Sequence, residues 1–273
     1  MTDESDLAAT PEREAIKTLY RRLGIVPSRT ESDFGCKWCK ECSQRASTLG
    51  KPFRTGGWPY VGVEYGRAKV RGVEARILLV AMDIGGNERS DAETFEDAQW
   101  RWRRYAEERY AENPHMRGVH LIMKRIAANE RDDEARARQF ALTNAVKCVT
   151  ETDNKKSTAT GKMQKNCKNH LGEEISVLKP DLIVTQGGYP AWATGTLLTP
   201  LTPVPEGKFC GEPRGRAQPK ALVWISASTV LLTTPHPARL KGFSWERRQL
   251  PDFFQKAIDK ACDELVKILR SGS

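Results

Sequence analysis

The sequence contains no apolar run of about 18 residues or more, the length at which a transmembrane helix is expected. Its first ten residues, MTDESDLAAT, are polar and acidic and lack the apolar core of a secretory signal. No internal repeat is visible. These absences predict a cytoplasmic protein without a membrane partner, and no feature implies an obligate protein partner, so we expect a monomer.

The chain has fewer acidic than basic residues. The chain has 44 Lys and Arg against 35 Asp and Glu, a net charge of +9 and a pI of about 9.2. This balance favours a polyanionic partner, of which nucleic acid is the simplest. The alternative is an ordinary, mildly basic protein that binds nothing acidic.

Cysteine, in contrast, is more abundant than packing in a reducing compartment requires. Three cysteines form two overlapping CxxC units in CKWCKEC, and two others lie 19 residues apart, after a strand and inside the next helix. Such clusters in cytoplasmic proteins bind metal more often than they form disulfides, and four thiolates suit either zinc or an iron–sulfur cluster. The seven are Cys36, Cys39, Cys42, Cys148, Cys167, Cys210 and Cys262.

Apolar runs that alternate with amphipathic segments predict an α/β protein with a parallel sheet between helical layers. Strands are expected at 76–83, 139–146, 181–188, 221–226 and 229–239. Helices are expected at 11–23, 92–110, 116–128, 163–178, from 189 onward and at 250–270. Residues 50–75 suggest a loop or hairpin, and residues 150–162 a polar loop.

Three of these strands end in residues that carry chemistry, and parallel sheets bind ligands at their carboxyl ends. Asp83 could orient water or stabilise a cation, or it could cap a helix. Asn144 could read the edge of a base, or bond its own backbone in a turn. His236 lies between two prolines that stiffen its loop, and could donate to an oxygen that gains charge or be a structural histidine.

A basic tip follows His236. Arg239, Leu240 and Lys241 could place an apolar wedge in a DNA duplex while cations hold phosphates. The alternative is an ordinary basic loop.

Taken together, these stretches resemble the uracil-DNA glycosylase superfamily, most closely its iron–sulfur family 4 enzymes. The resemblance rests on CKWC, on LLVAMDIGG in place of a Gly-Glu-Ala-Pro-Gly motif, and on TNAVKC in place of Thr-Asn-Val-Val-Lys-Cys. It continues through NCKNHLGEEISVLKPDLIVTQGG and HPAR, where the family usually has His-Pro-Ser. These pieces occur in the family's order and span most of residues 36–240.

The resemblance implies a three-layer α/β/α sandwich around a four-stranded parallel sheet, in a single domain over residues 1–273 with segment 1–50 packed onto it. It also implies a structural [4Fe–4S] cluster held by Cys36, Cys39, Cys148 and Cys167, with Cys42 as a rival ligand.

By position, Asp83 matches the residue that places water, Asn144 the amide that reads the base, and His236 the group that stabilises the departing base. Phe95 lies near the family's stacking Phe, although it could instead belong to the core face of its helix. Gly85, in the altered first motif, is assigned to base binding.

Departures from the family pattern bear on the substrate. The first motif carries Asp without its proline, and the segment from Asp83 to Asn144 is longer and rich in Trp, Tyr and Arg. The expected activity is a monofunctional DNA glycosylase that removes uracil, or a hypermodified phage cytosine in antiphage defence. Alternatives are a non-catalytic module that binds DNA or an abasic site with the same fold and cluster, and a zinc-stapled α/β protein with an unrelated ligand.

Overall fold

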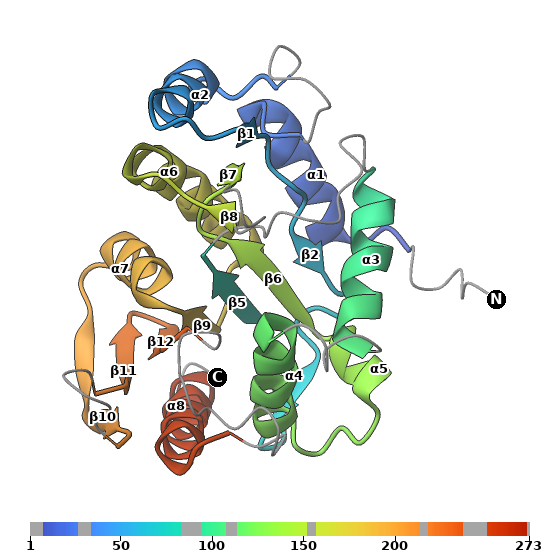
Figure 1. Ribbon diagram of the computed structural model, residues 1–273. Helices are drawn as coiled ribbons and strands as arrows, with labels where there is room; N and C mark the ends of the chain where they lie inside the picture. Colours follow the sequence, from blue (N-terminus) through green and yellow to red (C-terminus); the bar gives the residue numbers. More distant parts are fainter. Residues whose placement is uncertain are drawn as a thin grey trace.

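A computed structural model describes residues 8–26, 34–82, 94–107, 114–151, 157–212, 218–236 and 250–271. Their helices and strands form three layers, with one mixed sheet between two sets of helices (Figure 1). The helices are α1 (Pro11–Leu23), α2 (Cys39–Thr48), α3 (Phe95–Glu107), α4 (Pro114–Ile126), α5 (Asp133–Ala137), α6 (Gly161–Leu178), α7 (Gly188–Leu197) and α8 (Asp252–Ser271).

The main sheet has seven strands in the order β10-β11-β12-β9-β5-β6-β2. Its strands are β2 (Tyr60–Val61), β5 (Ile77–Ala81), β6 (Phe140–Asn144), β9 (Leu182–Gln186), β10 (Thr202–Cys210), β11 (Lys220–Ser226) and β12 (Thr229–Thr234). Strands β12, β9, β5 and β6 are parallel, which confirms the predicted four-stranded parallel sheet. At one edge, β11 pairs antiparallel with β12, and β10 pairs antiparallel with β11. At the other edge, β2 pairs antiparallel with β6.

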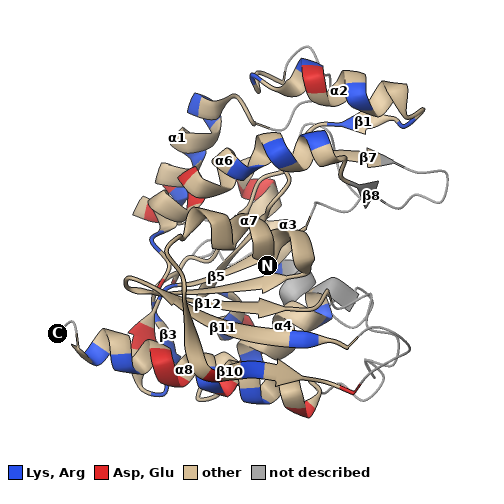
Figure 2. Cartoon of the chain, turned by 90° about the vertical axis from the view of Figure 1, so that its left-hand side faces the viewer, with Lys and Arg blue, Asp and Glu red and all other residues tan. Residues whose placement is uncertain are grey.

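The central strands are buried on both faces, because every residue of β5, β6 and β9 is buried. This is the usual state of parallel strands covered by helices on both sides. Helices α1, α6 and α7 cover one face of the sheet, and α4 and α8 cover the other (Figure 2). The predicted α/β/α sandwich is therefore confirmed.

Two small sheets lie beside the main one. One pairs β1 (Phe53–Arg54), β7 (Val149–Glu151) and β8 (Ser157–Thr158), and the other is a hairpin of β3 (Ala68–Val70) and β4 (Val73–Ala75). The hairpin confirms one of the two expectations for residues 50–75. Short β7 and β8 form within the segment expected to be a polar loop.

The N-terminal segment packs onto α6 through α1 and α2. Thr10 caps α1 by accepting a hydrogen bond from the Arg13 backbone N–H, and Gly24 ends the helix at a φ of 64°. A Cβ at Gly24 would fall 2.4 Å from the carbonyl oxygen of Gly35, so only glycine allows the chain to return this closely. The cysteine segment therefore starts beside the end of α1.

Several further elements were not anticipated. Residues 39–48, noted only for their cysteines, form helix α2, residues 202–210 form strand β10, and residues 133–137 form the short helix α5. The other predicted strands and helices are present with boundaries shifted by a few residues.

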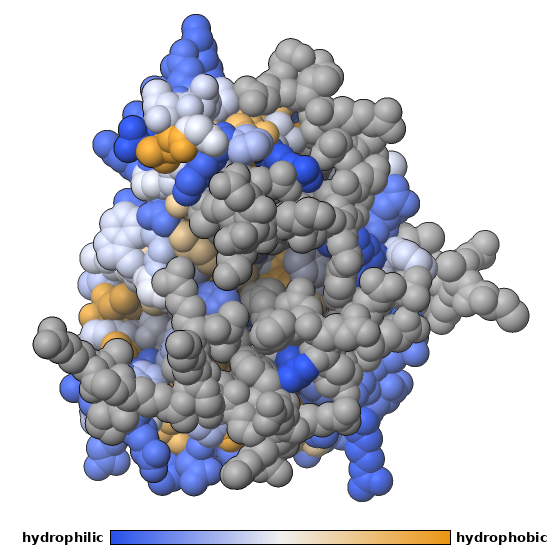
Figure 3. Space-filling view, viewed as in Figure 1, coloured by the Kyte–Doolittle hydropathy of each residue, from blue (hydrophilic) through white to orange (hydrophobic). Residues whose placement is uncertain are grey.

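No helix in the described ranges is long and apolar enough to cross a membrane. Where the face shown in Figure 3 is coloured, hydrophobic residues form small, separate patches among hydrophilic ones.

Candidate functional site

The carboxyl ends of the four parallel strands bring polar residues to one edge of the sheet. Asn144 of β6 pairs with Ala81 of β5, and Thr234 of β12 pairs with Gln186 of β9. Since Val80 pairs with Thr185, Gln186 is level with Ala81. Residues level with one another in parallel strands share a face of the sheet, so this row carries two amides separated by a methyl group.

Asn144 is the last residue of β6 and is only 6% exposed. Its backbone carbonyl accepts a hydrogen bond of 2.6 Å from Lys147 Nζ. The chain then continues along β5, because the backbone N–H of Ala145 donates to the Ala81 carbonyl and that of Val146 to the Met82 carbonyl. The Asn144 backbone is therefore held from two sides.

His236 lies two residues beyond the end of β12 and is partly buried. The position that a Cβ would occupy on Gly187, at the end of β9, is 3.4 Å from His236 Cβ and 3.7 Å from its Cδ2. Gly187 has a φ of 110°, which favours glycine, so the turn after β9 leaves room for the imidazole. Asn144 and His236 thus lie at the same sheet edge, on the two outer strands of the four.

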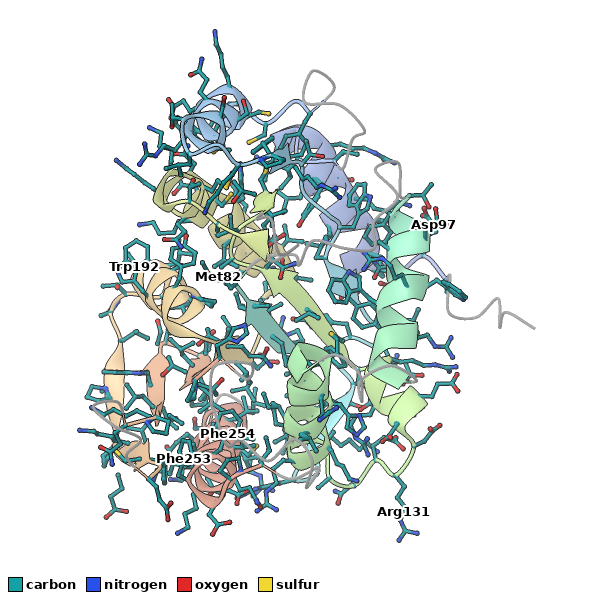
Figure 4. All side chains as sticks on the ribbon, viewed as in Figure 1. Met82, Asp97, Arg131, Trp192, Phe253 and Phe254 are labelled. Atoms are coloured by element: carbon teal, nitrogen blue, oxygen red, sulfur yellow. The ribbon has the colours of Figure 1, made fainter. Side chains whose placement is uncertain are left out.

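Several predicted site residues lie outside the described residues, namely Asp83, Gly85, Arg239, Leu240 and Lys241. The last described residue before Asp83 is Met82, which lies at the end of β5 (Figure 4). Strand β5 lies between β6 and β9, so the chain leaves the sheet toward Asp83 between the strands that carry Asn144 and Gln186.

Phe95, the predicted stacking residue, lies in the core. It is 5% exposed, its ring contacts Trp58 edge to face at 5.3 Å, and Lys17 Nζ lies 5.4 Å from its centroid. Trp58 in turn stacks on Tyr20 of α1. This packing favours the alternative, that Phe95 belongs to the core face of α3.

Five cysteines lie buried near one another, and all are free thiols. Burial raises the pKa of the Cys148 thiol well above its ordinary value, and the neighbouring thiols Cys167, Cys36, Cys42 and Cys39 raise it further. The pairing of β1 with β7 connects the chain that follows α2 to the residue directly after Cys148, since Arg54 pairs with Val149. This pairing explains how segments far apart in sequence bring their thiols together.

Three of these sulfurs have polar neighbours. The Lys147 N–H donates to Cys167 Sγ at 3.3 Å, Asn166 Nδ2 donates to Cys42 Sγ at 3.5 Å, and Cys36 Sγ lies 3.5 Å from His170 Nε2. Within the described ranges, no group of three or more His, Cys, Asp or Glu residues is arranged to hold a metal ion. The four cysteines predicted as ligands therefore remain a prediction, with Cys42 as close a candidate as the others.

A buried charged network lies behind Asn144. Lys147 Nζ is 2.5 Å from Glu174 Oε2 and 2.9 Å from Thr143 Oγ1. Tyr20 donates to the other oxygen of Glu174 at 2.5 Å, and Thr143 donates to Oε2 at 2.8 Å. The network joins α1, β6 and α6, and sequence reasoning missed it. A lysine directly after a buried strand, with a glutamate inside a helix that covers the sheet, was the available signal.

Gln186 was also missed, although it repeats the pattern that drew attention to Asn144. It is fully buried at the end of an apolar strand, and neither atom of its side-chain amide has a hydrogen-bond partner in the part of the chain that the structure describes.

An aromatic and cationic surface lies beside this edge, on α7 and α6. Trp192 is 55% exposed, contacts the ring of Tyr189, and has Lys168 Nζ 5.4 Å from its centroid. Figure 4 shows Trp192 at the outer side of α7, and Figure 2 shows basic residues along α6 and α2. Such a surface can hold a polyanion through cations and an aromatic ring.

Comparison with known proteins identifies one family. The family described as "Uracil DNA glycosylase superfamily" matches residues 100–262. This range includes β6, β9 and β12, and therefore Asn144, Gln186 and His236. No curated protein matches the chain.

Proposed function

Because this chain belongs to the uracil DNA glycosylase superfamily, whose members generally hydrolyse N-glycosyl bonds in DNA, we propose that it is a monofunctional DNA glycosylase. Its substrate is a non-standard pyrimidine, either uracil or a hypermodified phage cytosine, which is flipped out of the DNA stack. Its product is an abasic site in an intact strand.

The observation that carries this proposal is that Asn144 and His236 both lie at the carboxyl ends of the parallel strands, at one edge of the sheet. They come from β6 and β12, and the chain that leads to Asp83 leaves the sheet from β5 between them. A base inserted at this edge would meet an amide that can both donate and accept, and an imidazole that can donate. These are the groups needed to hold a base and to stabilise it as it leaves.

In the proposed reaction, the bond between C1′ of the sugar and the base nitrogen breaks, and its electron pair leaves with the base. His236 donates a hydrogen bond to the base as negative charge develops on it. Asp83 faces the oxocarbenium-like sugar and aligns a water molecule, whose oxygen bonds to C1′ while its proton passes to the carboxylate. No lysine nucleophile takes part, so the strand is not cut.

Lys147 has a positioning role in this scheme. Its ammonium donates to the backbone carbonyl of Asn144 and is held by the carboxylate of Glu174. A buried ion pair whose hydrogen bonds are satisfied fixes the backbone it contacts. The Asn144 amide is therefore presented from a rigid support.

The buried thiols would hold a [4Fe–4S] cluster through Cys36, Cys39, Cys148 and Cys167, with Cys42 as the rival ligand. Free thiols from separate segments kept together in a buried site are a donor set suited to a metal group that binds thiolates. The bound group would be structural and would take no part in base removal. It would fasten α2 and α6 to the end of β6.

DNA is the proposed partner, in line with the net charge of +9. Lys168, Trp192 and Tyr189 form a described surface beside the candidate site that fits a nucleic-acid strand. The wedge of Arg239, Leu240 and Lys241 remains a prediction from sequence.

The test is a panel of duplex and single-stranded DNA substrates that differ only in one pyrimidine: uracil, thymine, cytosine, hydroxymethylcytosine and its glucosylated form. Product is measured as alkali-sensitive abasic sites. We expect release of uracil or of a modified cytosine by the wild type, and loss of release in Asp83→Ala and His236→Ala. Lys69→Ala, on the β3–β4 hairpin, serves as the control for an unrelated substitution.

Release that survives both Asp83→Ala and His236→Ala would overturn the assignment of the site. Specific binding of DNA without release of any base would support a non-catalytic module instead. Release of uracil alone would exclude the defence substrate.

A further inference from the structure

Gln186 is a buried amide without a hydrogen-bond partner among the residues that the structure describes. Its side chain is 0% exposed, and within the described part of the chain neither Nε2 nor Oε1 makes a hydrogen bond. Buried polar groups in native proteins are nearly always paired, because an unpaired one loses its bonds to water without replacement. An amide kept in this state at the ligand-binding edge of a parallel sheet points to a ligand that pairs with it.

The row that contains Gln186 defines what such a ligand could be. Gln186 and Asn144 share one face of the sheet, with Ala81 between them at the same level. The two strand spacings between them place their backbones about 9–10 Å apart. This spacing is on the scale of one pyrimidine ring with a hydrogen bond of about 2.9 Å on either side.

The side chains next to this row are small. Ala81 contributes only a methyl group between the two amides, and Gly187 follows Gln186 with no side chain at all. His236 lies against Gly187, the residue that follows Gln186, at the end of β9 and β12. A base held between Asn144 and Gln186 would therefore lie within reach of the group assigned to its departure.

We propose that Gln186 is a second base-reading amide, which hydrogen-bonds one polar group of a flipped pyrimidine while Asn144 bonds another. This inference rests on the proposed function and specifies how the same site reads its substrate. The group that pairs with Gln186 must donate or accept a hydrogen bond, as the atoms of a ring amide, an amidine or a substituent hydroxyl do.

Thr185 provides an internal comparison. Its Oγ1 is also buried without a partner in the described structure, yet its side chain lies on the opposite face of the sheet from Gln186. It shares that face with Thr143, which bonds Glu174 of α6. An unpaired buried group on that face is a packing cost alone, whereas Gln186 faces the same side as Asn144.

The experiment compares Gln186→Leu with Thr185→Val in the full chain. Each substitution removes an unpaired buried polar group, so both variants should have a thermal unfolding midpoint higher than the wild type by about 2 °C or more. Two further readouts are kcat/KM on the accepted DNA substrate, and the rise in unfolding midpoint produced by free uracil, cytosine and hydroxymethylcytosine.

We expect Gln186→Leu to lower kcat/KM by about tenfold or more and to abolish the rise in midpoint with the free base, while binding of unmodified duplex DNA is unchanged. Thr185→Val should keep the wild-type values of both readouts. If Gln186→Leu stays within twofold of wild type in both, the amide is a packing residue and the proposal fails.

The measurement of the unfolding midpoint with free bases tests this proposal separately from the glycosylase assignment. A wild type that binds a free base but cleaves no DNA, with binding lost in Gln186→Leu, would support the role of Gln186 while the glycosylase proposal fails. A wild type stabilised by none of the bases would overturn the role of Gln186, even if DNA is cleaved.

Discussion

Lys147 Nζ lies 2.5 Å from Glu174 Oε2, and both side chains are almost completely buried. The pair joins the end of the strand that carries Asn144 to the middle of α6, and Tyr20 of α1 donates to the same carboxylate. Three segments that are far apart in sequence are thus held by one ion pair.

Lys147→Met should be strongly destabilising, because it leaves the Glu174 carboxylate buried without its cation. Breaking a buried pair on one side costs about 3–5 kcal/mol of unfolding free energy. Urea unfolding measures this cost. Arg22→Ala is the control, since it breaks an exposed pair with Glu173, 60% and 45% exposed, and should cost about 1 kcal/mol or less. Equal costs for the two variants would contradict the role of the buried pair.

On the proposed iron–sulfur assignment, Cys148→Ala should lose bound iron and brown colour and should harm folding, because it removes one of the buried, neighbouring thiols. Iron content, visible absorption and the unfolding midpoint of anaerobically purified protein measure this. Cys262→Ala is the matched control, a buried cysteine in α8, and should keep iron and colour. A colourless wild type that contains zinc would contradict the iron–sulfur assignment.

Single alanine substitutions of Cys36, Cys39 and Cys42 should identify which two of the three are ligands. Two variants should lose iron, while the third should keep it, because a four-thiolate site has no place for a fifth. The same iron assay decides. Loss of iron in all three variants would indicate that the whole segment must fold around the group.

Asn144→Ala should keep the fold and the bound metal but change which base is released. Lys147 bonds the backbone carbonyl of Asn144, which this substitution leaves in place. Loss of a side-chain hydrogen bond to the base should lower kcat/KM by roughly 10- to 100-fold. The base panel and a circular dichroism spectrum measure the two effects, and an unchanged base preference would exclude Asn144 from recognition.

Stability should fall with acidification, in part because of His120. Burial lowers the pKa of His120 below its ordinary value of 6.5, and Arg136 and Lys124 lower it further, while Asp133 opposes them. The unfolded chain therefore binds this proton more readily, so the contribution is present above about pH 6.5 and is lost as the pH falls toward the folded pKa. His120→Gln should weaken the pH dependence of urea unfolding between about pH 7 and pH 5. An unchanged slope would contradict the assignment.

Trp192→Ala and Lys168→Ala should weaken DNA binding. If Lys168→Ala removes one phosphate contact, the slope of log affinity against log salt concentration should become smaller by about one. Arg131→Ala is the control for loss of one positive charge, since Arg131 lies far from Trp192 in Figure 4. Equal loss of affinity in the Arg131 and Lys168 variants would indicate a general charge effect.

The sequence by itself determined the α/β class and the central strands. Apolar runs such as ILLVA and LIVTQ are too short for buried helices and too continuous for a half-exposed sheet, so they specify parallel strands. Asn144 was also visible in sequence, as a polar residue at the end of such a run.

Only the tertiary structure decided which residues meet. Strand register placed Gln186 level with Asn144 across Ala81, and neither composition nor periodicity specifies register between strands separated by some forty residues of chain. The Lys147–Glu174 pair depends on how α6 packs against β6. Phe95 lies in the core because its ring packs against Trp58. Local sequence fixes the faces and ends of single elements, because those depend on neighbouring residues. Contacts between elements depend on the packing of the whole chain. The sequence therefore predicted Asn144 and His236 but not Gln186 or the Lys147–Glu174 pair.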